Sequence, residues 1–292
     1  MNARFAMWGG VVLLFCASCL SASTEKEIGE LIASMEKSDY AGRDALRKLV
    51  RIGKPAVEQL LAALEHKTAR VRYWSAAALA QIGDERCVKP LMQLVKTDKH
   101  GLVRATALYY LRLFNDKEAW ELIIATLDSP DAGMRGWAIR ACREKNRVDA
   151  LPKLKELARK SDNYKTRYDA MVAAVTIAEK DATEFVRGIL KTDASVDVRI
   201  GAMKCLTVCK EKRPEMLTVM IDGLADRHPK VRTAAAALLR RGTNQEFPFD
   251  PDGDREDRAV AVANWRRWYE KHKDHLTWDD AKRRFEIREK RK

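Results

Sequence analysis

The sequence predicts an all-α protein, an α-α superhelix built from about seven helical hairpins. Three observations lead to this prediction. The chain of 292 residues has only 14 glycines and 8 prolines, which favours helices joined by short turns. An arginine recurs at intervals of 29 to 33 residues. After each arginine, small or apolar residues follow at the i, i+3, i+4 spacing of one helical stripe.

The recurring arginine begins the first helix of each repeat, and we call these first helices the Arg-helices. The buried stripe stands three, six and seven positions after the arginine, as at Ser75, Ala78 and Leu79. Small residues dominate this stripe, so we expect neighbouring Arg-helices to approach closely. The series consists of Arg43, Arg72, Arg104, Arg135, Arg167, Arg199 and Arg232.

A second helix follows each Arg-helix after a short break, and its apolar stripe is larger, as at Val88, Leu91 and Met92. An aspartate ends most repeats, five to seven residues before the next arginine. A turn aspartate can accept hydrogen bonds from free helix-start amides, and we expect the aspartates to pair with arginines between stacked repeats. These residues are Asp98, Asp128, Asp162, Asp193 and Asp226.

The repeats resemble the short HEAT repeats of the phycobilin-lyase-like type, here in Ser75 to Gly83 followed by Val88 to Val95. The resemblance covers about residues 26–245 and implies a HEAT/armadillo-like solenoid, which we place at residues 24–245. Such a fold is a stack of helical hairpins that offers an extended binding surface. It does not by itself define a function.

The two ends depart from the repeat. Ile28 and Met35 belong to an amphipathic helix that should cap the first repeat. Residues 246–292 should form a loop, a capping helix and a charged tail that is helical or frayed. In this segment Asp254 suits a helix start, and Trp265 and Trp268 should close the last repeat. The tail resembles that of exported HEAT proteins of some environmental bacteria.

Residues 1–22 have the layout of a secretory signal peptide, with a basic start and an apolar stretch from Met7 to Ala17. Ala17-Ser18-Cys19 resembles the end of a bacterial lipobox, although Cys16 stands where that motif usually carries leucine. Lipid attachment at Cys19 and plain cleavage near Ser21 to Ser23 both stay open. We therefore expect an exported protein that is periplasmic, membrane-tethered as a lipoprotein, or secreted.

The sequence predicts no catalytic centre, metal or cofactor. Beyond the signal segment it has no Cys-x-x-Cys pair, and it has no Gly-rich phosphate loop and no His-Glu dipeptide. The cysteines beyond the signal segment suit small buried hydrophobic residues. They are Cys87, Cys142, Cys205 and Cys209.

The favoured function is an exported, non-catalytic scaffold for protein–protein interaction. We expect the second helices to line its concave face, and the net charge of +13 favours an acidic protein or peptide partner and association with a membrane surface. Two alternatives stay open: a cytosolic nucleic-acid-binding solenoid, and a lyase-like HEAT enzyme or an accessory subunit of one. The predicted partner-binding residues are Glu58, Gln59, Gln93, Lys96, Lys153, Lys155 and Arg187.

Overall fold

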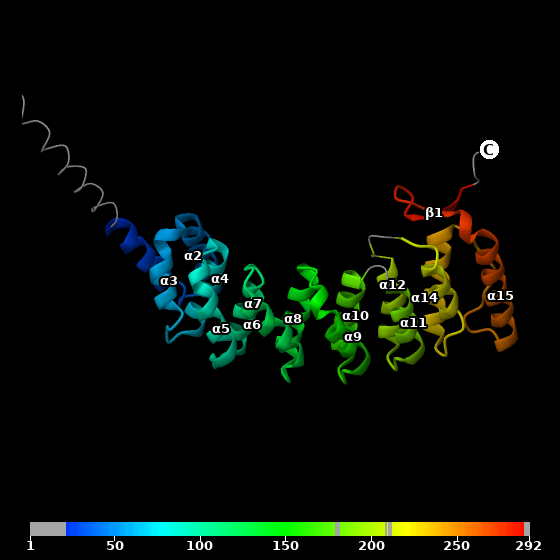
Figure 1. Ribbon diagram of the computed structural model, residues 1–292, viewed down its shortest axis with the longest axis horizontal. Helices are drawn as coiled ribbons and strands as arrows, with labels where there is room; N and C mark the ends of the chain where they lie inside the picture. The colour runs from blue at the N-terminus through cyan, green and yellow to red at the C-terminus, as the bar shows by residue number, and fades with distance from the viewer. Residues whose placement is uncertain (1–21, 179–181, 208, 210–211, 289–292) are drawn as a thin grey trace, which may run out of the picture. The chain divides into compact units, whose positions relative to one another are not determined.

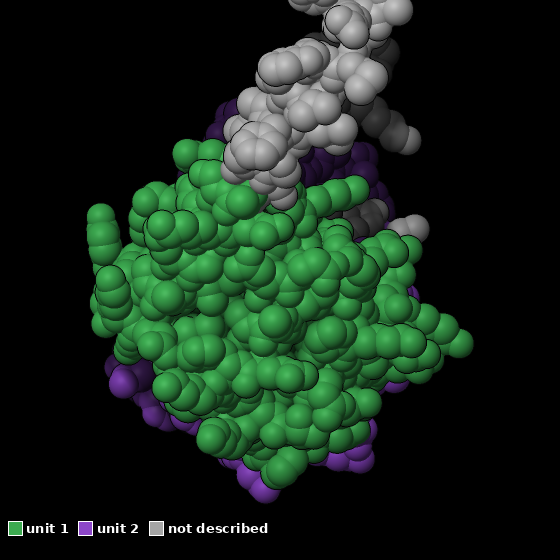
Figure 2. All heavy atoms as spheres, turned by 90° about the vertical axis from the view of Figure 1, so that its left-hand side faces the viewer, with its two compact units in different colours: residues 1–141 green, residues 142–292 purple. Residues whose placement is uncertain are grey.

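The computed structural model describes residues 22–178, 182–207, 209 and 212–288, and it confirms the all-α solenoid (Figure 1). The chain divides into two compact units, residues 1–141 and residues 142–292, which Figure 2 shows in different colours. Each unit is described by itself below. Most of the predicted signal segment, Cys19 included, lies outside the described residues.

Unit 1 contains four Arg-helices and the second helices between them. It begins with a helix over residues 22–34, in which Ile28 is fully buried, as is Met35 just after it. This helix confirms the predicted N-terminal cap. The elements that follow are α2 (Asp39–Ile52), α3 (Val57–Ala63), α4 (Ala69–Ile82), α5 (Val88–Thr97), α6 (Gly101–Leu111), α7 (Lys117–Ala125) and α8 (Ala132–Glu144), whose last residues belong to unit 2.

Unit 2 contains three Arg-helices, a longer closing helix and a small antiparallel sheet. Its elements are α9 (Leu151–Lys160), α10 (Tyr164–Ala178), α11 (Ala182–Thr192), α12 (Val196–Leu206), α13 (Met216–Gly223), α14 (Pro229–Thr243), α15 (Arg255–His272), β1 (Leu276–Asp279) and β2 (Arg284–Ile287). Single 3-10 turns stand in several connections of the two units, at Lys54–Ala56, Glu85–Cys87, Thr126–Asp128, Val148–Ala150 and Lys273–His275.

The helices form two layers within each unit. Arg-helices contact the next Arg-helix, and second helices contact the next second helix, as α4 does with α6 and α5 with α7. Most second helices also pack against the Arg-helix that follows more extensively than against the one before, whereas α7 contacts α6, the Arg-helix before it. The closely packed hairpin therefore consists of a second helix, the aspartate turn and the Arg-helix that follows. The sequence pattern instead predicted that each Arg-helix pairs with the second helix after it. The hairpin pairs in contact are α3–α4, α5–α6, α9–α10, α11–α12 and α13–α14.

The predicted small stripe of the Arg-helices is buried. Ser75, Ala78 and Leu79 have no exposed surface. Contacts between Arg-helices are tight: a Cβ added to Gly42 of α2 would lie 2.0 Å from the indole nitrogen of Trp74 in α4. The first member of the arginine series is an exception, because Arg43 is exposed and stands outside the pairing described next.

Buried arginine–aspartate pairs connect successive repeats, as expected from the sequence. Arg199 of α12 donates through Nε and Nη2 to both carboxylate oxygens of Asp226, over 2.8 and 3.0 Å. Its Nη1 donates to the carbonyls of Asp193 and Ala194, in the turn that precedes its own helix. The same arrangement joins Arg72 to Asp98 and Arg167 to Asp193. We call this arrangement an Arg–Asp pin.

The pin aspartate also accepts a backbone hydrogen bond in the turn, but the donor is the amide of the N-cap residue instead of a helix-start amide as predicted. Asp98, Asp193 and Asp226 each accept a hydrogen bond of 2.8 Å from the amide two residues later. Three further members of the series differ from the prediction. Arg135 donates to the carbonyls of Ser129 and Pro130 but forms no ion pair with an aspartate of the described residues. Arg104 pairs with Asp131 instead of Asp128, over 3.4 Å, and Arg232 donates to the carbonyl of Pro251, where other repeats have an aspartate.

The breaks after several Arg-helices use backbone that favours glycine or asparagine. Gly53 and Gly83 have φ values of +76° and +78°, and Asn146 has a φ of +51°. A left-handed residue here ends the helix and satisfies its last carbonyls. The local sequence therefore determines where these helices end.

The closing helix α15 forms as predicted, but the tail after it does not. The side chain of Asp254 caps α15 by accepting from the Asp257 amide over 2.8 Å, and Trp265 is buried against Phe247. The charged tail, expected as a helix or frayed segment, instead contains the hairpin of β1 and β2, in which Trp278 pairs with Phe285. Strand β2 contacts α14. Burial of Leu276 and Phe285 explains why this segment folds despite its charge.

Candidate interaction surface

Half-buried aromatic side chains gather with arginines on three consecutive Arg-helices of unit 1. The rings come from α4, α6 and the part of α8 that belongs to this unit, all labelled in Figure 1. They lie off the most deeply buried stripe, so each ring keeps part of its surface in contact with solvent. We call this set the aromatic–arginine surface: Tyr73, Tyr109, Tyr110, Trp137, Arg112 and Arg140.

Tyr109 is at the centre of this surface. Its ring lies 4.8 Å from the ring of Trp137 and 5.5 Å from that of Tyr110, both in edge-to-face geometry. The guanidinium carbon of Arg112 lies 3.7 Å above the Tyr109 ring, and that of Arg140 lies 5.0 Å away. Arg112 also donates to the Tyr109 hydroxyl over 2.6 Å. Rings and cations are therefore held in fixed positions relative to one another.

Tyr110 and Tyr73 extend the surface toward the N-terminal side of unit 1. The Tyr110 hydroxyl accepts a hydrogen bond from Gln81 over 3.2 Å. Burial raises the pKa of Tyr73 above its ordinary value, and the nearby Tyr110 hydroxyl raises it further. The Tyr73 phenol is therefore neutral near pH 7 and can donate a hydrogen bond.

The helices that carry this surface have almost no acidic residues. The segments Ala69–Ile82 and Gly101–Leu111 contain no aspartate or glutamate, and in Ala132–Glu144 the acid is the last residue. The same segments hold several arginines. These segments therefore contain more basic than acidic residues next to the aromatic rings.

The sequence-predicted partner residues of unit 1 lie elsewhere, on the second helices α3 and α5. Glu58 forms an ion pair with Arg86, and Gln59 donates to the Glu25 carbonyl over 3.0 Å. Gln93 and Lys96 are exposed on α5. Two of these four side chains are therefore already engaged with neighbouring repeats.

The three predicted residues of unit 2 are also partly engaged. Lys153 pairs with Glu156 over 3.2 Å, and the Lys155 ammonium lies 5.7 Å from the centre of the Phe185 ring. Arg187 of α11 pairs with Asp222 of α13 and donates to Thr218 Oγ1 over 2.7 Å. Arg187 thus connects two second helices.

The described cysteines are buried, as the sequence predicted. Burial raises the pKa of Cys87, Cys142 and Cys205 to about 12, so these thiols stay protonated near pH 7. Within the described ranges, no group of three or more His, Cys, Asp or Glu side chains could hold a metal ion. In the same part of the chain, no helix is both long and apolar enough to cross a membrane.

The aromatic–arginine surface was missed by reasoning from the sequence. Tyr110 was assigned to the buried stripe, but it is only half-buried. The available signal was the recurrence of Tyr or Trp one to six positions after the arginine in three adjacent Arg-helices, together with the absence of acidic residues among them.

Comparison with known structures finds several similar helical-repeat chains. The complex of CpcE and CpcF of phycocyanin lyase from Nostoc sp. PCC7120 is 24% identical, covering 50% of this chain and 96% of that chain, with a TM-score of 0.47. YibA of Escherichia coli is 19% identical, covering 73% and 92% of the two chains, with a TM-score of 0.38. Human deoxyhypusine hydroxylase in complex with glycerol is 17% identical, covering 87% and 99%, with a TM-score of 0.39.

No curated protein matches this sequence. The family model for HEAT repeats does match it, over residues 28–112, 88–175 and 151–240. These overlapping matches span most of the chain and confirm the resemblance read from the repeats. The chain therefore belongs to the HEAT-repeat family.

Proposed function

We propose that this protein is a non-catalytic scaffold that binds an acidic segment of a partner protein through the aromatic–arginine surface. The observation that supports this proposal is the contact between Tyr109, Trp137 and two arginines on adjacent helices that have almost no acidic residues. The proposal retains the scaffold role and the acidic partner expected from the sequence. It places the first contact on the Arg-helices instead of the second helices.

The residue types suit recognition of a protein. Tyrosine, tryptophan and arginine are the side chains that most often contribute strongly to binding free energy at protein interfaces. Aromatic rings lose little conformational entropy on binding, and here Tyr109 is already held by the hydrogen bond from Arg112. A guanidinium group can bind a carboxylate through two parallel hydrogen bonds. An acidic segment with an apolar side chain would therefore match both components of the surface.

The second helices are a less suitable primary site. Arg187 and Glu58 are engaged in ion pairs between repeats, so a partner would have to replace those contacts. Gln93 donates to Thr97 Oγ1 over 3.3 Å, and both Gln93 and Lys96 lie exposed on α5. That the second helices line a concave face stays a prediction.

Export is part of the proposal, and it rests on the basic and apolar residues of the N-terminal segment. The intact mass of the mature protein from its native cells tests it. A start at Cys19 with acyl chains would give a membrane-tethered scaffold, and a start near Ala22 a secreted or periplasmic one. An uncleaved Met1 would contradict export.

Photo-crosslinking in the native cells tests the binding surface. A benzophenone amino acid at Tyr110 should capture a protein partner, whereas the same group at Lys96 should not, because Lys96 lies on the second helix α5. Arg140→Ala should weaken binding of the purified partner by about tenfold or more, as expected for loss of a charge-assisted hydrogen bond. Capture at Lys96 alone would move the site to the second helices and refute this placement.

The same experiment separates the two alternative functions. A nucleic-acid partner would be lost on nuclease treatment, and its affinity would fall steeply with salt. An enzyme with a bound metal or pigment would be revealed by elemental analysis and by an absorption spectrum of the protein purified from its native cells.

A further inference from the structure

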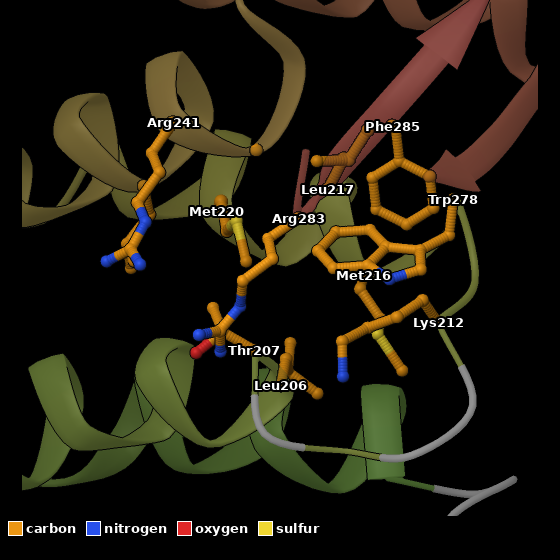
Figure 3. Close-up of a pocket in the computed structure, with 12 residues that line it drawn as sticks. Leu206, Thr207, Lys212, Met216, Leu217, Met220, Arg241, Trp278, Arg283 and Phe285 are labelled. Atoms are coloured by element: carbon orange, nitrogen blue, oxygen red, sulfur yellow. The ribbon is translucent and has the colours of Figure 1, made fainter. Parts of the chain in front are cut away.

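Unit 2 contains a pocket between the β-hairpin and the helices α12, α13 and α14 (Figure 3). Its apolar floor is formed by residues of α12 and α13 that include Leu206, Met216 and Met220, and one wall by Trp278 and Phe285 of the hairpin. The two aromatic rings lie 5.2 Å apart in edge-to-face geometry. The cavity volume is about 170 Å³, slightly more than the ~150 Å³ of a cavity known to accept benzene.

Three cationic side chains surround this apolar space, and each comes from a different segment. Lys212 precedes α13, Arg241 lies in α14, and Arg283 lies in the hairpin turn. In Figure 3 the Arg283 guanidinium lies near Thr207, with the Arg241 guanidinium on one side of it and the Lys212 ammonium on the other. No aspartate or glutamate lines the pocket, and no carboxylate of the described residues forms an ion pair with any of the three.

Two residues of the hairpin have distinctive local structure. Trp278 donates from its indole nitrogen to Asp280 over 2.9 Å, which orients the ring below the Lys212 ammonium, 5.4 Å from the ring centre. Arg283 has a φ of +53°. An arginine in this left-handed region is unusual, and strained backbone of this kind tends to occur at functional sites.

The electrostatics favour an anion. Burial lowers the pKa of Lys212 below its ordinary value, and the charge of Arg283 lowers it further, while Asp280 has the opposite effect. A carboxylate placed between these cations would offset their mutual repulsion. The apolar floor and the aromatic wall would at the same time bury a hydrophobic group attached to it.

We infer that this pocket binds a carboxylate attached to an apolar group of roughly the size of one aromatic ring, with Arg283 and Lys212 holding the carboxylate and Trp278 and Phe285 enclosing the apolar group. Two sources share this chemistry: a free aromatic or aliphatic acid, and the C-terminus of a peptide whose last side chain is apolar. The site lies in unit 2 and is independent of the aromatic–arginine surface.

Isothermal titration calorimetry on the full mature chain tests this inference with four probes. These are phenylpropionate, its amide, an acetylated tetrapeptide that ends in Phe with a free carboxylate, and the same peptide as an amide. At least one carboxylate probe should bind with one-to-one stoichiometry, and its amide should bind about tenfold more weakly or worse, because a charge-assisted hydrogen bond is lost. Phenylpropionate binding as tightly as the peptide would indicate a free acid as ligand, and a much tighter peptide would indicate a chain terminus.

Two matched variants keep the test specific to the pocket. Arg283→Gln should weaken carboxylate binding by about tenfold or more. Lys282→Gln should leave it unchanged, because it removes the same charge from the neighbouring residue, which pairs with Glu286 outside the pocket. Circular dichroism would establish that both variants are folded. The inference would be overturned if acid and amide bound equally, or if both variants lost binding equally. It would also be overturned if inorganic phosphate bound as tightly as phenylpropionate, or if no probe showed saturable binding below about 10 mM.

Discussion

The Arg–Asp pins predict a large difference in stability between two arginines at the same repeat position. The Arg199 side chain is 1% exposed and its partner Asp226 is 6% exposed. Arg199→Ala leaves the Asp226 carboxylate buried without its guanidinium and also removes the hydrogen bonds to two turn carbonyls. Removing one partner of a buried ion pair costs about 3–5 kcal/mol, so we expect a loss of that size in the free energy of unfolding.

Arg104 is the matched control, because it occupies the equivalent position on α6. Its side chain is 29% exposed, and its partner Asp131 is 44% exposed at 3.4 Å. Exposed ion pairs contribute about 0–1 kcal/mol, and Arg104 also donates to the Asp98 carbonyl over 3.0 Å. We therefore expect Arg104→Ala to cost about 1 kcal/mol, roughly a third of the loss at Arg199 or less.

Urea denaturation followed by circular dichroism measures both variants against the unmodified chain. A double variant, Arg199→Met with Asp226→Leu, should recover part of the stability, because it removes the isolated buried charge and keeps the side chains packed. Equal losses for Arg199→Ala and Arg104→Ala would refute the reasoning. So would a double variant less stable than Arg199→Ala, since the cost would then not come from the unpaired carboxylate.

Three further predictions test packing and acid stability, each by urea denaturation. Gly42→Ala should destabilise the protein by about 1–3 kcal/mol, because the new methyl group would overlap Trp74. The control Gly136→Ala adds a methyl group where the helix has open space, so it should stabilise the protein by about 0.5–1 kcal/mol. Stabilisation by both substitutions would contradict the close packing of α2 and α4. Leu111→Ala removes a fully buried side chain and should lower the free energy of unfolding by about 2–5 kcal/mol. Leu113, which is 40% exposed, should lose far less on the same substitution. Similar losses would mean that the helical register is wrong. Burial opposes the ionisation of Asp98, but its hydrogen bonds outweigh this effect and lower its pKa in the folded state. The ionised Asp98 should therefore stabilise the folded protein fully above the unfolded pKa of about 3.9, and this contribution should be lost as the pH falls through the folded pKa. The stability difference between the unmodified chain and Asp98→Asn should therefore be larger at pH 7 than at pH 3, and a difference independent of pH would disprove this link.

The repeat itself could be predicted from the sequence because each repeat must bury the same stripe and close the same turn. The i, i+3, i+4 pattern fixed the buried face at Ser75, Ala78 and Leu79, and the aspartate turns indicated the pins. The pairing of helices into hairpins was misassigned because the stripe shows which face is buried and not which neighbour covers it. The helix contacts show that the tight hairpin begins at the preceding second helix, and the pins agree, because their arginines bond to the turn before their own helix.

The hairpin of the C-terminal segment was missed for a different reason. Its strands have the period-two pattern of Leu276 and Trp278 and of Phe285 and Ile287, but each strand has only four residues and many charges lie between them. Its turn also lacks an Asn-Gly or Asp-Gly pair, and the left-handed position is occupied by Arg283. The pocket could not be predicted, because it requires the hairpin and three helices together.

The unequal burial of the pins has a mechanical consequence. Each repeat contacts only its neighbours, so thermal motion or force separates a stack first at its weakest connection, which is the one most exposed to water. In unit 1 the connection at Arg72 is closed to solvent, while the one at Arg104 is partly open and longer. The junction between α6 and α8 should therefore be the compliant point of this unit, and the aromatic–arginine surface spans that junction. Contact with a partner on both sides would stiffen it, so amide hydrogen exchange in the turn near Asp131 should slow when the surface is occupied.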